Sequence, residues 1–374
     1  MHIAILGAGI NGLMSALEFL EQDCTVSIFD QRQVAKAASW AGGGILSPMY
    51  PWRYSQAVND LAKHAMPLYQ EWNQKLQPIT KIDFQIHETG MLILDEDDFE
   101  IGLNYAHVHQ NPVQHAEYLQ HEQLEQLNPH LHPKYRQAIY FPHLANVRNP
   151  RLLKSITTYL KQHPKVTFHE YCPIKKLNIK HGIVHSISNH QGTIFQADHF
   201  VLTTGAWSEQ WAQQLQKEIP VQPVQGQMVL FKTPENWLPT MCMNKVMYLI
   251  PRLDGHIVCG SSMREVGFNT EPDAKIKQDI LSACFDMIPE LKKFPIVQEW
   301  AGLRPSSPSG VPYIGKIEQT HNLWANFGHF RNGLCMAPAS AKLLKQLMFN
   351  LPTIENAAVY APTRLIHQAD AIIS

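Results

Sequence analysis

The chain begins with an apolar run that leads into three glycines at a fixed spacing, HIAILGAGINGL over residues 2–13. Gly7, Gly9 and Gly12 form a G-x-G-x-x-G pattern, and a helical pattern follows over 11–21. In such a unit the first glycine allows a tight turn, the second lets a pyrophosphate approach the backbone, and the third lets the helix pack closely on the strand. The helix then directs its free N–H groups at the phosphates. The stretch therefore predicts a strand–turn–helix that binds a dinucleotide.

A second predicted strand, Thr25–Asp30, supports this interpretation. It ends in an acid about twenty residues beyond the glycines, where a partner for a ribose hydroxyl is expected. Asn11 is polar where such turns often carry an apolar residue, but the contact expected there runs through the backbone. Nucleotide binding is thus predicted at this end of the chain.

The charge balance argues against several classes of partner. The 374 residues carry a formal net charge of -1 and a sequence pI near 7.0. The chain therefore lacks the excess of positive charge that binding to nucleic acid or an anionic membrane usually requires. No apolar stretch approaches the length of a membrane span, and the first strand leaves no room for a signal peptide ahead of it. We expect a cytoplasmic protein with a small-molecule partner.

Cysteines and histidines give no sign of a metal site. The six cysteines contain no C-x-x-C pair, which excludes a zinc ribbon and a disulfide framework and indicates reduced thiols. The 20 histidines are densest in HVHQNPVQH, residues 107–115, but no H-E-x-x-H pattern occurs. We expect a solvated histidine-rich surface and no bound metal.

The order of the remaining elements predicts an α/β fold combined with antiparallel β structure. Apolar residues at helical spacing predict one helix over 56–76, and Asn149 is expected to cap another helix with Pro150 at its first position. Several β-runs fill the stretch between Val221 and Trp300. We expect a discontinuous Rossmann-like nucleotide-binding domain (1–77, 145–218 and 301–374) with an inserted, mostly antiparallel substrate domain (78–144 and 219–300), an arrangement typical of flavoproteins.

A loop with three consecutive glycines, ASWAGGGILSPMYPWRY over 38–54, follows the acid-ended strand. Adjacent glycines leave backbone amides bare, so a planar group or its pyrophosphate can approach closely. The alternative is a flexible surface loop, but Trp40, Tyr50 and Trp52 are too apolar for one. The stretch favours a loop that covers a cofactor.

A second stretch, WANFGHFRNGLCMAPAS over 324–340, predicts a strand, a turn at Gly328 and a helix that begins near Asn332 or Gly333. The N-terminus of a helix beside the pyrimidine end of an isoalloxazine would stabilise the negative charge that gathers there on reduction. The alternative is an ordinary strand–turn–helix connection, which would not need Arg331 in its turn.

Six stretches together resemble the FAD-dependent amine oxidases of the D-amino-acid oxidase group, and most of all the bacterial glycine oxidases of thiamine biosynthesis. They are GAGINGL, WAGGGILSPMYPWRY, TTGAWS, YLIPR, EWAGLRPSSPSGVPYIG and GHFRNGLCMAPAS, and the resemblance covers essentially the whole chain. It implies oxidative deamination of glycine and of other small amines or D-amino acids, such as sarcosine and D-alanine, to an imine or α-keto acid. It also implies that hydride passes to FAD, that O₂ becomes H₂O₂, that the glycine imine supplies thiamine thiazole synthesis, and that the protein is a homo-oligomer (dimer or tetramer).

The same resemblance assigns site residues by position. Arg304 matches the arginine that pairs with the substrate carboxylate, Tyr248 a tyrosine that adds a hydrogen bond, and Met263 a methionine that contacts the substrate. EWAGLRPSSPSGVPYIG lacks the cysteine to which some relatives attach FAD, so non-covalent FAD is expected. The residues implied to hold FAD are Gly7, Gly9, Ile10, Asn11, Gly12, Asp30, Gln31, Ala37, Ala38, Gly42, Gly43, Gly44, Ile174, His329, Phe330, Arg331, Asn332, Gly333 and Leu334.

The implied reaction requires few catalytic side chains. A neutral amine can assist transfer of its α-hydrogen as hydride, so no acid–base pair is required, and Arg304 fixes the Cα–H through a planar two-point contact. Arg304 could instead belong to a structural ion pair, and Arg331 could either position the flavin or bind substrate. The functional alternatives are a D-amino-acid dehydrogenase, a sarcosine-type oxidase, and a nucleotide-binding module without redox chemistry.

Overall fold

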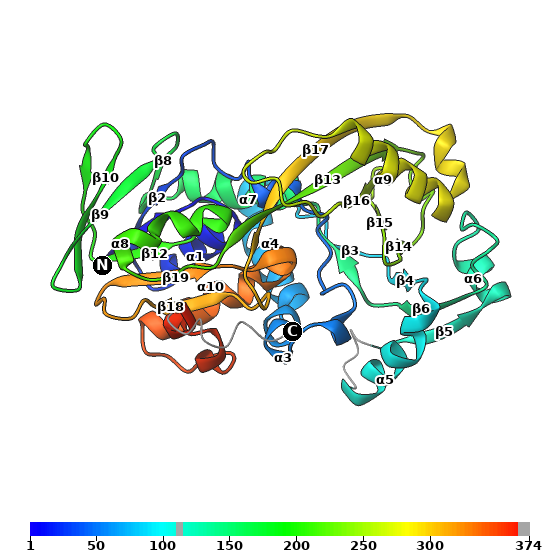
Figure 1. Ribbon diagram of the computed structural model, residues 1–374, viewed down its shortest axis with the longest axis horizontal. Coiled ribbons are helices and arrows are strands. Elements are labelled where there is room, and N and C mark those ends of the chain that lie inside the picture. The colour runs from blue at the N-terminus through cyan, green and yellow to red at the C-terminus, as the bar shows by residue number, and fades with distance from the viewer. Residues whose placement is uncertain (110–114, 366–374) are drawn as a thin grey trace.

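The computed structural model describes residues 1–109 and 115–365, which form two large β-sheets side by side along the long axis (Figure 1). The first is six-stranded, in the order β18-β19-β12-β1-β2-β8. All its neighbours pair in parallel except β18 and β19, as the prediction of a Rossmann-like unit requires. Its strands are β1 (His2–Leu6), β2 (Thr25–Phe29), β8 (Val166–His169), β12 (His199–Leu202), β18 (Tyr313–Lys316) and β19 (Leu323–Phe327).

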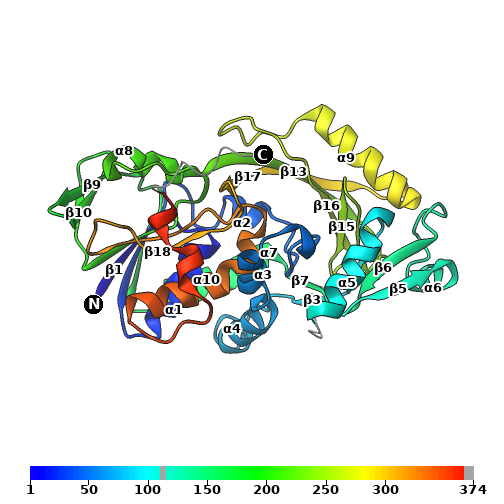
Figure 2. The same ribbon diagram turned by 60° about the horizontal axis from the view of Figure 1, so that its bottom comes forward.

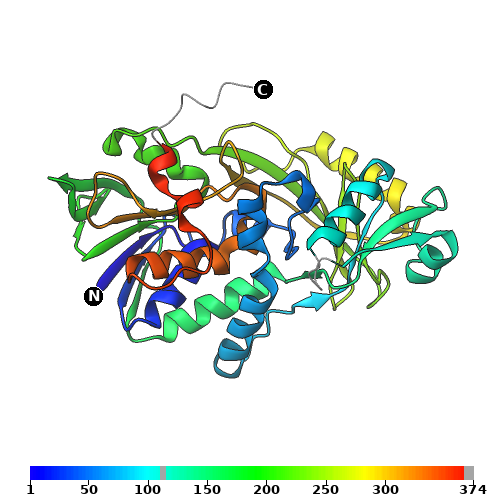
Figure 3. The same ribbon diagram turned by 90° about the horizontal axis from the view of Figure 1, so that it is seen from below.

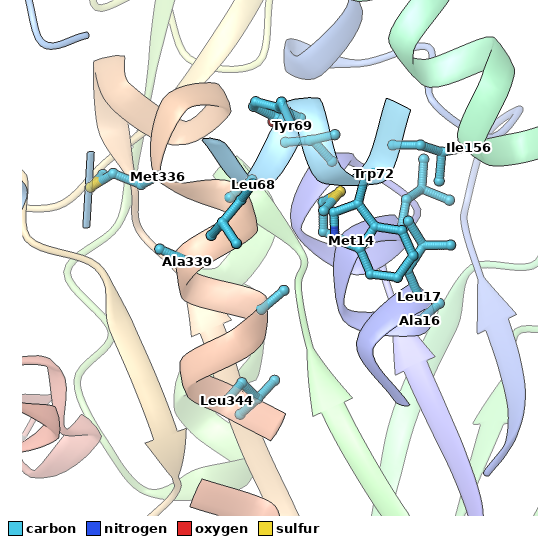
Figure 4. Close-up of a cluster of buried hydrophobic side chains, with 14 of the residues drawn as sticks. Met14, Ala16, Leu17, Leu68, Tyr69, Trp72, Ile156, Met336, Ala339 and Leu344 are labelled. Carbon is cyan, nitrogen blue, oxygen red and sulfur yellow. The ribbon is translucent and has the colours of Figure 1, made fainter. Parts of the chain in front are cut away.

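Four helices cover one face of this sheet, and Figure 3 shows three of them, α4, α7 and α10, from below. The helices are α1 (Ile10–Leu20), α4 (Ala65–Thr80), α7 (Asn149–Gln162) and α10 (Gly333–Met348). Figure 4 shows their buried side chains meeting, with Leu17 from α1, Trp72 from α4 and Ile156 from α7 among them. Ile3 and Ile5 of β1 point into this cluster, whereas Ala4 and Leu6 point to the opposite face.

The opposite face is covered by a small antiparallel sheet of β9 (Ile174–Lys180), β10 (Ile183–Asn189) and β11 (Ile194–Phe195). Helix α8 (Ala212–Leu215) packs on the same side. A parallel sheet that is buried on both faces consists of nearly continuous apolar residues, and β1 has that composition.

The second sheet has eight strands, in the order β17-β13-β16-β15-β14-β4-β6-β5, and β14 with β4 is its one parallel pair. Helix α9 (Ala274–Met287) covers one face and α5 (Phe99–His109) lies on the other. The strands are β4 (Met91–Ile93), β5 (Glu117–Gln120), β6 (Gln137–Phe141), β13 (Gln222–Lys232), β14 (Met241–Met243), β15 (Tyr248–Pro251), β16 (His256–Gly260) and β17 (Ile296–Ser306).

The long strands β13 and β17 form one edge of the second sheet and extend from it toward the first sheet, as Figures 1 and 2 show. The predicted domain boundary at residues 300 and 301 falls inside β17, and the domain limits stay a prediction. The shorter elements are β3 (His87–Glu88), which pairs with β7 (Ala145–Asn146), and the helices α2 (Ala38–Ala41), α3 (Gln56–Ala62) and α6 (His121–Leu127). Within residues 1–109 and 115–365, no helix has both the length and the apolarity to span a membrane.

The single helix predicted over 56–76 is wrong, because α3 ends at Ala62 and α4 begins at Ala65. Pro67 lies in the first turn of α4 and has no N–H to donate to the carbonyl of Lys63, a position that favours the start of a helix. The apolar residues whose spacing predicts this helix are nonetheless all buried, namely Val58, Leu61, Ala65, Leu68, Trp72 and Leu76. Their spacing continues across the break, which is why periodicity alone did not reveal it.

A buried ion pair joins α1 to α10. The Lys345 ammonium contacts the Glu18 carboxylate and lies 2.8 Å from Oε2 of Glu21, and the side chains of Lys345 and Glu18 are 8% and 3% exposed. Lys75 of α4 binds the other oxygen of Glu21 at 2.9 Å. Burial raises the pKa of Glu18, whereas the contact with Lys345 opposes that rise. The contacts fix the relative positions of the helices whose N-termini form the site described below.

We expect Lys345→Met to lower the free energy of unfolding by about 3–5 kcal/mol, because it leaves the Glu18 carboxylate buried without its cation. The double variant Glu18→Met/Lys345→Met should recover most of this loss. Urea denaturation of the three proteins checks the prediction. A single variant as stable as the unmodified protein would contradict it.

Candidate active site

A large cavity lies where the two sheets meet. The predicted site residues that line it are Gly7, Gly9, Ile10, Asn11, Asp30, Gln31, Ala37, Ala38, Gly42, Gly43, Gly44, Ile174, Tyr248, Arg304, Phe330, Arg331, Asn332, Gly333 and Leu334. The cavity thus joins the glycine turn, the three-glycine loop and Arg304 in one continuous site.

The glycine turn between β1 and α1 is too crowded for side chains. Gly7 has φ +113°, and a Cβ there would lie 2.4 Å from the carbonyl oxygen of Thr203. A Cβ on Gly12 would lie 2.0 Å from the Gly7 carbonyl oxygen, so Gly12 serves helix packing and does not line the cavity. Helix α1 begins after Gly9, which has no side chain to cap it. The turn therefore presents backbone N–H groups and the positive end of the helix to the cavity.

Asp30 lies at the end of β2 beside this turn. The N–H groups of Ala8 and Arg32 donate to its two carboxylate oxygens, at 2.8 Å each. Burial raises the pKa of Asp30, while these two donors act in the opposite direction. A carboxylate has about four lone-pair sites, so Asp30 can still accept hydrogen bonds from ligand hydroxyl groups.

A second helix N-terminus faces the same cavity. Helix α10 follows a single 3₁₀ turn, Phe330–Asn332. Asn332 is 6% exposed, and its Nδ2 has no hydrogen-bond partner among the described residues. A buried donor without a partner is costly, so this amide fits a site whose acceptor comes from a ligand.

His329 supports the cavity from behind and does not line it. Its Nδ1 lies 3.2 Å from Nδ2 of Asn11, and its Nε2 lies 3.1 Å from Oγ of Ser340. Burial lowers the pKa of His329 to about 3, so the ring is neutral near pH 7. With Asn11 as donor to Nδ1, the ring proton sits on Nε2 and donates to Ser340.

The three-glycine loop forms part of the wall. Gly44 has φ +81°, and a Cβ there would lie 2.2 Å from the carbonyl oxygen of Val147. Asn149 does not cap α7 as expected, because the cap residue is Arg148. Its amide instead donates to the carbonyls of Ser39 and Gly42, at 2.8 and 3.0 Å. The side chain thus stabilises the loop at the expense of the helix end.

Arg304, from β17, is partly buried and has no acidic partner among the described residues. Its guanidinium donates to the carbonyl of Ser262 at 3.1 Å and to the hydroxyl of Ser261. It lies against Gly226, where a Cβ would be 2.2 Å from Nη2. Burial lowers the pKa of Arg304, and nearby Arg331 lowers it further. Across residues 1–109 and 115–365, no carboxylate lies within ion-pair distance, so the structural ion-pair alternative has no partner there.

The structure does not bring every predicted residue to the cavity. Met263 is 57% exposed and lies outside the lining, whereas Met228 lines it and its sulfur accepts from the Tyr248 hydroxyl at 3.5 Å. Met228 was missed because a methionine within a strand pattern carries no signal of its own. Arg331 lines the cavity and is exposed.

The histidine-rich stretch 107–115 lies partly outside the described residues. Within the part of the chain that the structure describes, no group of three His, Cys, Asp or Glu residues could hold a metal ion.

Comparisons with known proteins agree on one family. The family described as "DAO: FAD dependent oxidoreductase" matches residues 2–347. The glycine oxidases of Pseudomonas putida and Pseudomonas aeruginosa are 40% and 38% identical over 361 residues, which cover 96% of this chain and 98% of each relative. The crystal structure of glycine oxidase from Geobacillus kaustophilus has the same fold, with a TM-score of 0.91 at 23% identity, over 98% of this chain and 99% of that one.

We expect small carboxylates to bind Arg304 and raise the Tm of the protein, because no carboxylate of the described chain lies within ion-pair distance of its guanidinium. A ligand at 100 times its Kd stabilises the folded state by about 2.7 kcal/mol. Acetate should therefore raise the Tm of the unmodified protein and of Arg264→Met more than chloride at equal ionic strength does. It should have no such effect on Arg304→Met. An equal acetate effect in all three proteins would show that the anion binds elsewhere.

Proposed function

This chain belongs to the family of FAD-dependent oxidoreductases, and from that membership we propose that it oxidatively deaminates glycine and other small amines or D-amino acids, with O₂ as acceptor. Two proteins named glycine oxidase share 40% and 38% identity with it over almost their whole lengths. The observation that carries the proposal is the partly buried Arg304, which has no carboxylate partner in the described chain and faces the cavity.

The residues of the cavity fit FAD. Gly7 and Gly12 let α1 pack closely behind the turn that presents its N–H groups to a pyrophosphate, and Asp30 keeps free acceptor sites for a ribose. The unpartnered Nδ2 of Asn332 suits an acceptor on the cofactor. When bound, FAD supplies the ring that takes two electrons from the substrate and passes them to O₂.

We propose that FAD is held without a covalent bond. Cys335 lines the cavity near Asn332, but its thiol donates to the Asn332 carbonyl at 3.3 Å. Burial raises the pKa of Cys335 to about 12, so the reactive thiolate is scarcely present near pH 7.

Arg304 and Tyr248 would bind the amino acid. The planar guanidinium can donate two parallel hydrogen bonds to the carboxylate, and Tyr248, which faces Arg304, can add a third. Such a contact fixes the Cα–H and replaces the water that the carboxylate loses. Arg331 lies on the same side and adds positive charge there.

The lining holds no evident base for the substrate amine. Asp30 is the one carboxylate among the described lining residues, both of its oxygens accept backbone N–H groups beside the glycine turn, and no histidine lines the cavity. The amine must then lose its proton before the α-hydrogen is transferred. This agrees with a mechanism in which the amine lone pair assists the transfer and the chain only positions the substrate.

The resemblance also supports finer proposals. We propose that the protein acts in the cytoplasm as a homodimer or homotetramer and supplies the glycine imine for thiamine thiazole synthesis. The second candidate is a D-amino-acid dehydrogenase or a sarcosine-type oxidase. Measurement of H₂O₂ release with glycine, sarcosine, D-alanine, D-proline and L-amino acids separates them. Amine-dependent reduction of a quinone without H₂O₂ would favour the dehydrogenase.

Arg304→Ala should lower kcat/KM for glycine by an amount equivalent to about 2–5 kcal/mol, because the substrate carboxylate would be buried without a partner. Arg304→Lys should also impair turnover, since it keeps the charge but loses the planar fork. Both variants should remain yellow. The control substrate is a simple amine without a carboxylate, and an equal loss for both substrates would refute the assignment of Arg304.

The apparent affinity for glycine should improve as the pH rises from 6 to 10. The free amine group is mostly protonated near pH 7, and only the neutral form can assist transfer of the α-hydrogen. Steady-state kcat/KM across this range checks the expectation. A flat profile would indicate a protein group that accepts the amine proton.

A further inference from the structure

Arg252, directly after β15, holds the three-glycine turn from outside the cavity. Its Nη2 donates to the Gly43 carbonyl at 2.6 Å, and its Nη1 donates to the Val147 carbonyl at 2.9 Å and to Oδ1 of Asn146. Gly43 lines the cavity, whereas Arg252 does not. One guanidinium therefore ties the cavity wall to the chain that leads from β7 into α7.

The turn is closely packed on the side of this contact. A Cβ on Gly43 would lie 2.7 Å from Cδ1 of Ile250, and one on Gly44 would lie 2.2 Å from the Val147 carbonyl oxygen. The backbone is thus packed between β15 and residue 147. Only one peptide unit separates the guanidinium from the cavity.

The positive charge of Arg252 is not neutralised by its contacts. The residue is 6% exposed, and its three acceptors are neutral carbonyl oxygens. Asp254 faces it, but that carboxylate is bonded to Arg148 and lies 2.9 Å from Nδ1 of His256. In the described residues no acid lies within ion-pair distance of Arg252.

A buried charge without a counter-ion is costly to fold, and it acts over a longer distance than an exposed charge because little water screens it. Its field therefore reaches across the Gly43 peptide into the cavity. A cofactor that gains negative charge on reduction would be stabilised there in its reduced form.

We propose that Arg252 is a positioning residue for bound FAD, which fixes the Gly42–Gly44 turn in its binding shape and places a positive charge behind it that favours the reduced cofactor. The proposal depends on the use of FAD and not on which amine is oxidised.

Three variants of the holoenzyme test it, namely Arg252→Met, Arg252→Lys and the control Arg148→Met. Arg148 is the neighbouring arginine; its side chain is 26% exposed and is paired with Asp254. The readouts are the dissociation constant of FAD, from fluorescence, and the two-electron midpoint potential, from reductive titration. Neither requires an amine substrate.

Arg252→Met should weaken FAD binding and reduce the preference for reduced FAD by ~tenfold, which a two-electron couple shows as a potential lower by about 30 mV. Arg252→Lys should keep the potential of the unmodified protein and bind FAD more weakly, because an ammonium cannot reach all three acceptors in one plane. Arg148→Met should change neither quantity.

An unchanged potential and FAD affinity in Arg252→Met would overturn the proposal, as would an equal potential shift in Arg148→Met. If Arg252→Met does not fold, the test depends on Arg252→Lys. An FAD affinity of Arg252→Lys equal to that of the unmodified protein would overturn the proposal, and so would a lower midpoint potential. Failure of the proposed function is distinct, since it would appear as holoenzyme that titrates normally with a chemical reductant but is not reduced by any amine.

Discussion

The close packing of α1 on β1 is the constraint on which the rest of the structure depends. Gly12 can approach Gly7 only because neither residue carries a Cβ, and Gly7 in turn lies against the Thr203 carbonyl at the end of β12. This contact brings the helix N-terminus to the carboxyl edge of the parallel sheet, where ligands of such sheets bind. The Glu18–Lys345 pair then sets α10 beside α1, so a second helix N-terminus reaches the same cavity.

Glycines also allow the second sheet to lie close to this site. Gly226 of β13 pairs with Gly302 of β17. A Cβ on Gly302 would lie 2.5 Å from that of Ala41 in α2, and one on Gly226 would collide with the Arg304 guanidinium. The two glycines thus allow the sheet to touch the nucleotide-binding part and let Arg304 lie flat against the backbone. The cavity wall and Arg304 are parts of one packed unit.

The sequence predicts those parts of the arrangement that depend on residues close together in the chain. The turn at Gly7, the acid-ended strand before Gln31 and the helix that begins at Gly333 each follow from residues close together in the chain. The break between α3 and α4 escapes prediction because the helical spacing of apolar residues continues across it. Asn149 was assigned to its own helix end, because no local pattern shows that its amide bonds to a loop more than a hundred residues away. Met228 and Arg252 gain their importance only from tertiary contacts.

Rapid anaerobic mixing of the holoenzyme with glycine is the most direct test of amine oxidation at this site, because it separates that step from any reaction with O₂. We expect the oxidised flavin absorbance to disappear at a rate that saturates with glycine, and this rate to fall sharply in Arg304→Ala. A flavin that dithionite bleaches, but that glycine, sarcosine and D-alanine leave oxidised, would contradict the proposed function.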